Sequence, residues 1–242
     1  TNRPRKNDGL RPVIRFMRGR SVVDIMPRLV DLSHPIEAGM ITYPGMPGPV
    51  ISDYMSRADS RGRYDLGTEF NIGRIDMIAN TGTYLDTPFH RFESGFDLAD
   101  LPLEKVADLA GILVQNAGPE LVAEVLYDVD VAGKAVLFST GWDRHWRTDG
   151  YGDPSHPFVS AGLVDALVAG GTALVGIDSV NIDDTRGGGR PAHTGLLEAG
   201  IPIVEHLTRL GQLVDQEFRF FAVPSPVREM GSFPVRAFAV VG

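Results

Sequence analysis

Cysteine is absent from the 242 residues of the chain. Disulfide bonds, zinc–thiolate centres, iron–sulfur clusters and a cysteine nucleophile are therefore excluded. Long hydrophobic runs are absent as well, since no apolar run reaches the roughly 18 residues that a membrane span needs. The first residues do not have the pattern of a signal peptide. We expect a cytoplasmic protein without a membrane partner.

Positive charge is scarce outside the N-terminus. The chain has 23 Lys and Arg against 31 Asp and Glu, which gives a net charge of −8. Seven of the basic residues lie within residues 1–20, beside the single acid Asp8. The remaining chain is acidic and does not suit nucleic acid. We expect residues 1–20 to form a basic extension that reaches another subunit, and residues 21–242 to form the catalytic domain.

Helix and strand patterns alternate along the chain, and 43% of the residues are hydrophobic, as in soluble globular proteins. Helices are predicted at Pro119–Leu126 and Ser160–Ala169. Strands are predicted at Glu69–Ile78, Ala135–Ser139, Thr172–Ile177, Phe218–Val223 and Arg236–Val241. Residues 39–49 and 52–66 are predicted to be irregular. This alternation predicts a layered α/β domain.

The first segment that could carry catalytic or metal-binding residues is Asn80–His90. Asp86 and His90 are four residues apart, and Pro88 between them stiffens the backbone. Gly82 permits a turn that a side chain would obstruct. A strand that ends in a constrained turn would project Asp86 and His90 outward, as enzymes present reactive groups on loops. The alternative is that both side chains only satisfy local backbone groups.

The second segment contains His193 and Glu205. His193 follows the triplet Gly187–Gly189 in a long acidic stretch that begins at Asp178 and is predicted to be a loop. The triplet lacks the features of a phosphate-binding or dinucleotide-binding loop. The chain also lacks a Gly-x-Ser-x-Gly motif, which disfavours a serine nucleophile.

Together these segments resemble the cyclase family of metal-dependent hydrolases, which includes bacterial kynurenine formamidase and isatin hydrolase. Residues 80–90 resemble the family signature His-x-Gly-Thr-His-x-Asp-x-Pro-x-His. Other matching segments, in chain order, are Asp31–Ile36, Tyr43–Gly45, Thr140–Trp142, Gly176–Ser179 and Pro191–His193 with Glu205. The resemblance spans most of the chain after residue 28.

The resemblance implies a single-domain α/β fold of the swivelling β/α/β type, assembled as a homodimer or homotetramer. It also implies one or two divalent metals. By resemblance, Asp86, His193 and Glu205 are metal ligands and His90 is the acid/base residue. A metal of this kind lowers the pKa of a bound water and polarises a carbonyl group.

The chain departs from the signature at Asn80 and Tyr84, which stand where the family has two histidines. Asn offers a weak neutral oxygen, and Tyr is a poor ligand unless it is ionised, with a usual pKa of about 10. We therefore expect at most one divalent metal, Mn, Zn or Fe, at Asp86, His193 and Glu205. Tyr84 is expected either to donate a hydrogen bond to a developing oxyanion or only to fill space.

Three functions remain open at this point. The first is hydrolysis of an amide, lactone or related cyclic compound through a metal-activated water. The second is metal-free acid/base catalysis by His90 and its neighbours, which suits cyclisation, dehydration or isomerisation of a polyketide-like or aromatic substrate. The third is an inactive binding relative, which the retained ligand set argues against.

Loop aromatic side chains suggest a small, flat substrate with a carbonyl group. The candidate substrate-binding residues are Asn80, Phe89, Tyr43, Trp142 and Arg190. Arg190 can hold a substrate carboxylate, or it can pair with the neighbouring Asp183 or Asp184.

Overall fold

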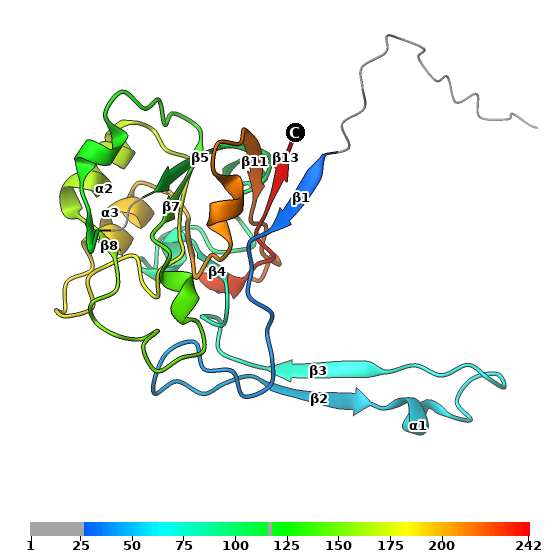
Figure 1. The fold of residues 1–242 in the computed structure, drawn as a ribbon. Helices are drawn as coiled ribbons and strands as arrows, with labels where there is room; N and C mark the ends of the chain where they lie inside the picture. The colour runs from blue at the N-terminus through cyan, green and yellow to red at the C-terminus, as the bar shows by residue number, and fades with distance from the viewer. Residues whose placement is uncertain (1–26, 116–117) are drawn as a thin grey trace, which may run out of the picture.

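The structure of the protein, a computed structural model, describes residues 27–115 and 118–242 (Figure 1). Its centre is a nine-stranded sheet in the order β1-β13-β11-β5-β7-β9-β10-β4-β12. The strands are β1 (Arg28–Asp31), β4 (Tyr84–Asp86), β5 (Leu109–Gln115), β7 (Ala135–Ser139), β9 (Leu174–Ile177), β10 (Ile203–Glu205), β11 (Phe218–Phe221), β12 (Ser232–Pro234) and β13 (Phe238–Val241). The α/β prediction is thereby confirmed.

The four central strands β5, β7, β9 and β10 run parallel. Both flanks are antiparallel: β4 and β12 follow β10, whereas β11, β13 and β1 follow β5. Strands β7, β9 and β10 are buried on both faces, which explains why β7 and β9 are nearly continuous apolar runs, whereas most of β5 is half-buried. In β7, for example, Val136 and Phe138 face one core, and Leu137 faces the other.

Helices α2 (Ala161–Ala169) and α3 (Pro191–Glu198) pack side by side and contribute to one of these cores. Helix α2 begins where the sequence predicts, because the Ser160 side chain accepts a hydrogen bond from the backbone N–H of Leu163. The short 3-10 helices are η1 (Pro88–His90), η2 (Leu103–Lys105), η3 (Ala123–Leu126), η4 (Trp142–His145) and η5 (Leu210–Leu213). No helix among residues 27–115 and 118–242 is long and apolar enough to cross a membrane.

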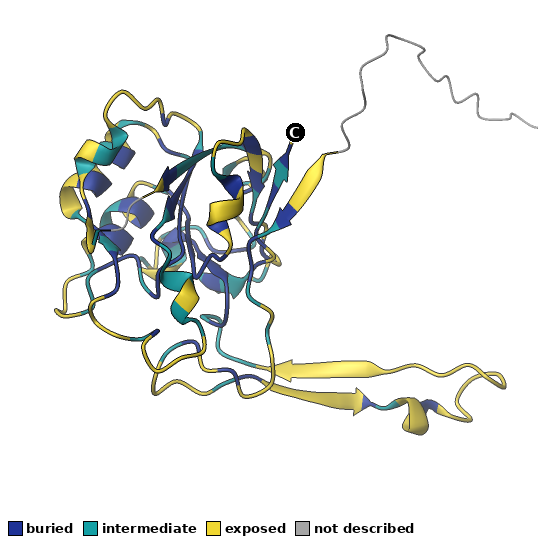
Figure 2. Ribbon diagram, viewed as in Figure 1, coloured by how far each residue is buried: buried dark blue, intermediate teal, exposed yellow. Residues whose placement is uncertain are grey.

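A hairpin of β2 (Val50–Met55) and β3 (Ile72–Asp76), with α1 (Arg57–Ser60) near its tip, extends away from the main sheet (Figure 1). Both strands are almost entirely exposed (Figure 2). The irregular segment predicted for residues 52–66 is therefore wrong in part, since most of β2 and all of α1 lie within it. The strand forms because it pairs with β3, a partner that its own sequence does not reveal.

The helix predicted at Pro119–Leu126 is also wrong. This segment contains the short strand β6 (Glu120–Leu121) followed by the 3-10 helix η3. Strand β6 pairs in parallel with β8 (Phe158–Val159), and this pairing prevails over the local helical pattern. The predicted basic extension at residues 1–20 lies outside the described residues.

Candidate metal and catalytic site

Asp86 lies at the end of β4, between two neighbouring strands. In the sheet register it stands opposite Ile203 of β10 on one side and Ser232 of β12 on the other. The prediction that Asp86 projects outward from a turn is wrong, because the residue is inside a strand and fully buried. Its Oδ1 accepts a hydrogen bond from Ser232, whereas its buried Oδ2 has no hydrogen-bond partner.

The turn before β4 forms as its glycine suggests, since Gly82 has a φ angle of 64°. After β4 the chain enters η1, whose first residue is Pro88 and whose last is His90. The His90 side chain is 35% exposed, which leaves it accessible to a ligand. Its Nδ1 lies 2.8 Å from Ser232 Oγ and 3.7 Å from Asp86 Oδ1.

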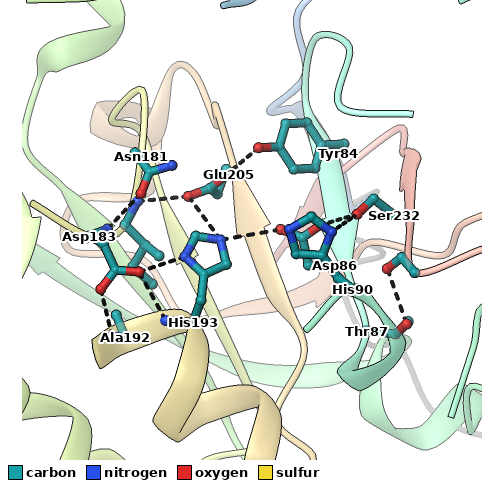
Figure 3. A network of polar contacts seen from close by, with 12 residues as sticks. Tyr84, Asp86, Thr87, His90, Asn181, Asp183, Ala192, His193, Glu205 and Ser232 are labelled. Atoms are coloured by element: carbon teal, nitrogen blue, oxygen red, sulfur yellow. Dashed lines mark hydrogen bonds and ion pairs between the residues drawn. The ribbon is translucent and has the colours of Figure 1, made fainter. Parts of the chain in front are cut away.

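His193 lies in the first turn of α3, so its predicted place on a long loop is wrong. The helix begins at Pro191, and Asp183 caps it by accepting hydrogen bonds from the backbone N–H groups of Ala192 and His193. The same carboxylate lies 2.6 Å from Nδ1 of His193 (Figure 3). This contact places a proton on Nδ1, so Nε2 is the nitrogen that can take up a second proton or bind a metal.

Nε2 of His193 faces two carboxylates. It lies 3.7 Å from Asp86 Oδ2 and 3.8 Å from Glu205 Oε1. Burial lowers the pKa of His193, but the charges of Glu205 and Asp86 and the hydrogen bond to Asp183 outweigh it, so the pKa is raised well above 6.5. The site therefore attracts a positive charge at this nitrogen, either a proton or a metal ion.

Glu205 is fully buried at the end of β10, and burial raises its pKa. Its Oε1 accepts a hydrogen bond from the backbone N–H of Ile182 at 2.7 Å. Its Oε2 accepts from the hydroxyl of Tyr84 and, at 3.1 Å, from that of Tyr43. Burial and the nearby Glu205 hold the pKa of both phenols well above 10, so both remain protonated donors.

The hydrogen-bond chain continues away from Glu205. The two tyrosine oxygens lie 2.6 Å apart, and Nε2 of His206 lies 3.0 Å from the Tyr43 hydroxyl. Burial lowers the pKa of His206 to about 3, which keeps this ring neutral. Since the one proton of Tyr84 is donated to Glu205, Tyr84 is not free to stabilise an oxyanion in this arrangement.

A cavity of about 410 Å³ opens onto these groups. Of the residues predicted from the sequence, its wall includes Tyr43, Asn80, Tyr84, His90, Arg190 and His193. Phe89 and Trp142 are not part of this wall, and the Trp142 indole instead donates to the backbone oxygen of Tyr151. Met46, Arg91, Asn181 and Thr185 line the cavity in addition.

The donor groups fit a divalent metal. Ligand atoms at about 2.1 Å from a tetrahedral metal lie about 3.4 Å from one another. The separations of 3.7 and 3.8 Å around Nε2 of His193 are close to this value. A metal there would also satisfy the unpartnered Oδ2 of Asp86. The described residues whose potential ligand atoms all lie within 4.8 Å of one another are Asp86, His90 and His193, and Glu205 adjoins this set with its Oε1 at 3.8 Å from Nε2 of His193.

Comparison with known proteins identifies the family of the chain. The model of the family Cyclase, described as "Putative cyclase", matches residues 30–184. The chain belongs to the cyclase family.

Curated relatives of this cyclase-family chain include a kynurenine formamidase of Bacillus cytotoxicus, 26% identical over 213 residues, which cover 86% of the chain and 95% of that protein. Another is a kynurenine formamidase of Salinibacter ruber, 28% identical over 215 residues with the same coverage. The chain is an enzyme of the cyclase family, and these named relatives are hydrolases.

Solved structures show the same fold. An isatin hydrolase bound to the product analogue thioisatinate superimposes with a TM-score of 0.75 at 18% identity, over 90% of this chain and 94% of that one. A protein described as a potential metal-dependent hydrolase with cyclase activity gives a TM-score of 0.72 at 24% identity, over 88% and 98%.

Two polar residues of this cyclase-family site are not identified by sequence reasoning. Asp183 holds the ring of His193, and its sequence offers no more than an acid ten residues before His193, next to Asp184. Ser232 contacts both Asp86 and His90 and lies in no recognisable motif. The two arginines of this segment have different surroundings: Arg186 pairs with Asp184, whereas Arg190 lines the cavity.

Proposed function

We propose that this cyclase-family enzyme hydrolyses an amide or lactone bond of a small carbonyl compound, with one divalent metal held by Asp86, His193 and Glu205. The observation that carries the proposal is the buried, unpartnered Oδ2 of Asp86, which lies 3.7 Å from Nε2 of His193. Its support is the identity of 25–28% to kynurenine formamidases over most of the chain.

The metal would supply Lewis acidity, which polarises a carbonyl group and acidifies a water molecule. One nitrogen and two carboxylates suit Mn, Fe or Zn. The protein provides two of these ligands with an outer partner: Asp183 fixes the His193 ring, and Tyr84 holds one oxygen of Glu205. His90, on the cavity wall, takes up and returns the proton of the reaction.

The substrate we propose carries a negatively charged group. Arg91 and Arg190 line the cavity, and neither has a carboxylate within 4 Å among the described residues. Nη1 of Arg190 donates to the backbone oxygens of Gly187 and Gly189, which fixes the guanidinium in place. A carboxylate is the natural partner of such a group. Tyr43 and Met46 offer apolar surface for a flat ring.

We also propose that the protein is a homo-oligomer, in its simplest form a dimer, in which a second copy covers the β2–β3 hairpin. An isolated two-stranded hairpin is at best marginally stable in water. This hairpin exposes large apolar side chains along both strands: Val50, Ile51, Tyr54, Ile72 and Ile75. Burial against another chain would remove this apolar surface from water.

The experiment is a hydrolysis assay on formylated aromatic amines and aromatic lactones, each with and without a carboxylate. We expect turnover that a chelator abolishes and that Mn or Zn restores. Asp86→Asn should be inactive, whereas Asp184→Asn should keep the activity, because Asp184 is a half-buried acid paired with Arg186. Turnover that survives complete metal removal would contradict the metal-assisted hydrolase and favour acid/base cyclisation or dehydration.

A further inference from the structure

Ser232 joins the two reactive parts of the site. The residue is 4% exposed and begins β12, directly opposite Asp86 in the sheet register. Its hydroxyl donates a hydrogen bond to Oδ1 of Asp86 and lies 2.8 Å from Nδ1 of His90 (Figure 3). The distance of 3.7 Å between Asp86 and His90 themselves is too long for a hydrogen bond.

The single proton of the Ser232 hydroxyl determines which group donates and which accepts in its two hydrogen bonds. A serine hydroxyl has one proton and two lone pairs. Because Ser232 donates its proton to Asp86, it can only accept at His90. Nδ1 of His90 therefore carries the hydrogen, and Nε2 retains its lone pair. Since Nε2 has no hydrogen bond to a described side chain and His90 lines the cavity, this nitrogen is available to a ligand.

The backbone holds Ser232 against His90. A Cβ atom on the preceding Gly231 would lie 2.2 Å from the backbone nitrogen of His90, so only glycine allows the two segments to approach this closely. The carbonyl oxygen of Gly231 also accepts hydrogen bonds from the backbone N–H and the hydroxyl of Thr87, at 2.7 and 3.1 Å. Strand β12 is thus fixed to the start of η1, independently of the serine side chain.

From this geometry we propose that Ser232 is a positioning residue, which fixes His90 with its proton on Nδ1 and its basic Nε2 open to the cavity. The same hydroxyl occupies Oδ1 of Asp86 and so leaves Oδ2 for His193 and the metal. The catalytic meaning of this arrangement rests on the proposed function. The tautomer itself does not, since the hydrogen bonds alone determine it.

The test is two-bond ¹H–¹⁵N NMR of the full-length protein, zinc-loaded because Zn²⁺ is diamagnetic, with ¹⁵N in its six histidines. His90 is assigned from His90→Gln. We expect the wild type and Ser232→Thr to show His90 protonated at Nδ1, and Ser232→Ala to lose this preference. His193 is the internal control, because Asp183 holds its tautomer in every variant. Retention of the Nδ1 proton of His90 in Ser232→Ala would overturn the proposal.

Once a substrate is known, separate measurement of kcat and KM completes the test. Ser232→Ala should lower kcat on the order of 10- to 100-fold, the range typical of outer-shell partners, with KM nearly unchanged and with recovery in Ser232→Thr. An equal loss of kcat in Ser232→Thr would contradict a role for the hydroxyl. If no amide or lactone is hydrolysed, the proposed function fails, whereas the NMR result still decides the role of Ser232.

Discussion

The hydroxyl of Tyr84 donates a hydrogen bond to Oε2 of Glu205, and it does so from a position where the family signature has a histidine. Tyr84 is 1% exposed, and burial keeps its pKa well above 10, so it remains protonated. A protonated phenol that donates to Glu205 is a partner of this proposed metal ligand and not itself a ligand. This relationship is the physical basis for expecting one metal per chain.

Restoration of the two signature histidines should therefore restore a second metal. In the double variant Asn80→His/Tyr84→His we expect metal content to rise from about one to about two per chain. Both positions line the cavity, so the new imidazoles have room to face it. Elemental mass spectrometry after metal repletion and desalting measures the ratio. The control Tyr84→Phe should stay near one, and an unchanged ratio in the double variant would contradict the explanation.

Asp183→Asn should weaken metal binding without removing a ligand. The amide no longer fixes the proton on Nδ1 of His193, and the loss of such an outer partner lowers metal affinity on the order of 10- to 100-fold. Zinc titration against a competing chelator measures the affinity. The matched control is Asp184→Asn, because Asp184 is the adjacent residue but pairs with Arg186 away from the cavity. Equal affinity in both variants would exclude the role of Asp183.

Arg190→Gln should raise KM for a carboxylate-bearing substrate about tenfold or more, since charge-assisted hydrogen bonds contribute about 1.5–3 kcal/mol. KM for the matching neutral substrate should change little. Arg186→Gln serves as the control, because its guanidinium already pairs with Asp184. Steady-state kinetics on the two substrates gives the comparison. The same KM change for both would mean that Arg190 holds the loop rather than the substrate.

The hairpin variants Ile51→Asp and Ile75→Asp should lower the solution mass to that of one chain. These two side chains stand opposite each other in the β2–β3 register, and both are 48% exposed. A charge in a buried interface is costly, whereas on a free hairpin it has little effect. Light scattering after gel filtration measures the mass. Leu103→Asp is the control, as an exposed apolar residue on η2. A monomeric wild type would refute the proposed assembly.

Sequence reasoning succeeded where structure is determined locally. The apolar run of β7 and the serine cap of α2 are both readable from neighbouring residues. It failed where a distant strand decides, as at β6, whose parallel partner is β8. At the site, the resemblance identified Asp86 and His193, which the structure brings together. Ser232 was missed because its role depends on the register between β12 and β4.

Protonation of His34 at acidic pH should lower the free energy of unfolding. Burial lowers its pKa to about 4; Asp143 opposes this shift, and Arg209 and Arg147 add to it. A folded-state pKa below the unfolded value of 6.5 means that stability is full above pH 6.5 and is lost as pH falls through about 4. The loss is on the order of 3 kcal/mol.

His34→Phe removes this titration and keeps a ring to stack on Trp146, whose centroid lies 4.0 Å from that of His34. Urea unfolding between pH 7 and pH 4 should therefore show a shallower loss of stability in the variant than in the wild type. Parallel profiles for the two proteins would assign the acid sensitivity to other groups.

The order of strands around β4 has a consequence for the folding of the protein. Asp86 precedes both of its neighbours in the sheet, because β10 and β12 lie far downstream of β4 in the sequence. A nascent chain that still lacks β12 has no hydroxyl between Asp86 and His90. The pocket is thus assembled from segments that lie far apart in the sequence, and a folding intermediate in which β12 has not yet docked would lack a complete site.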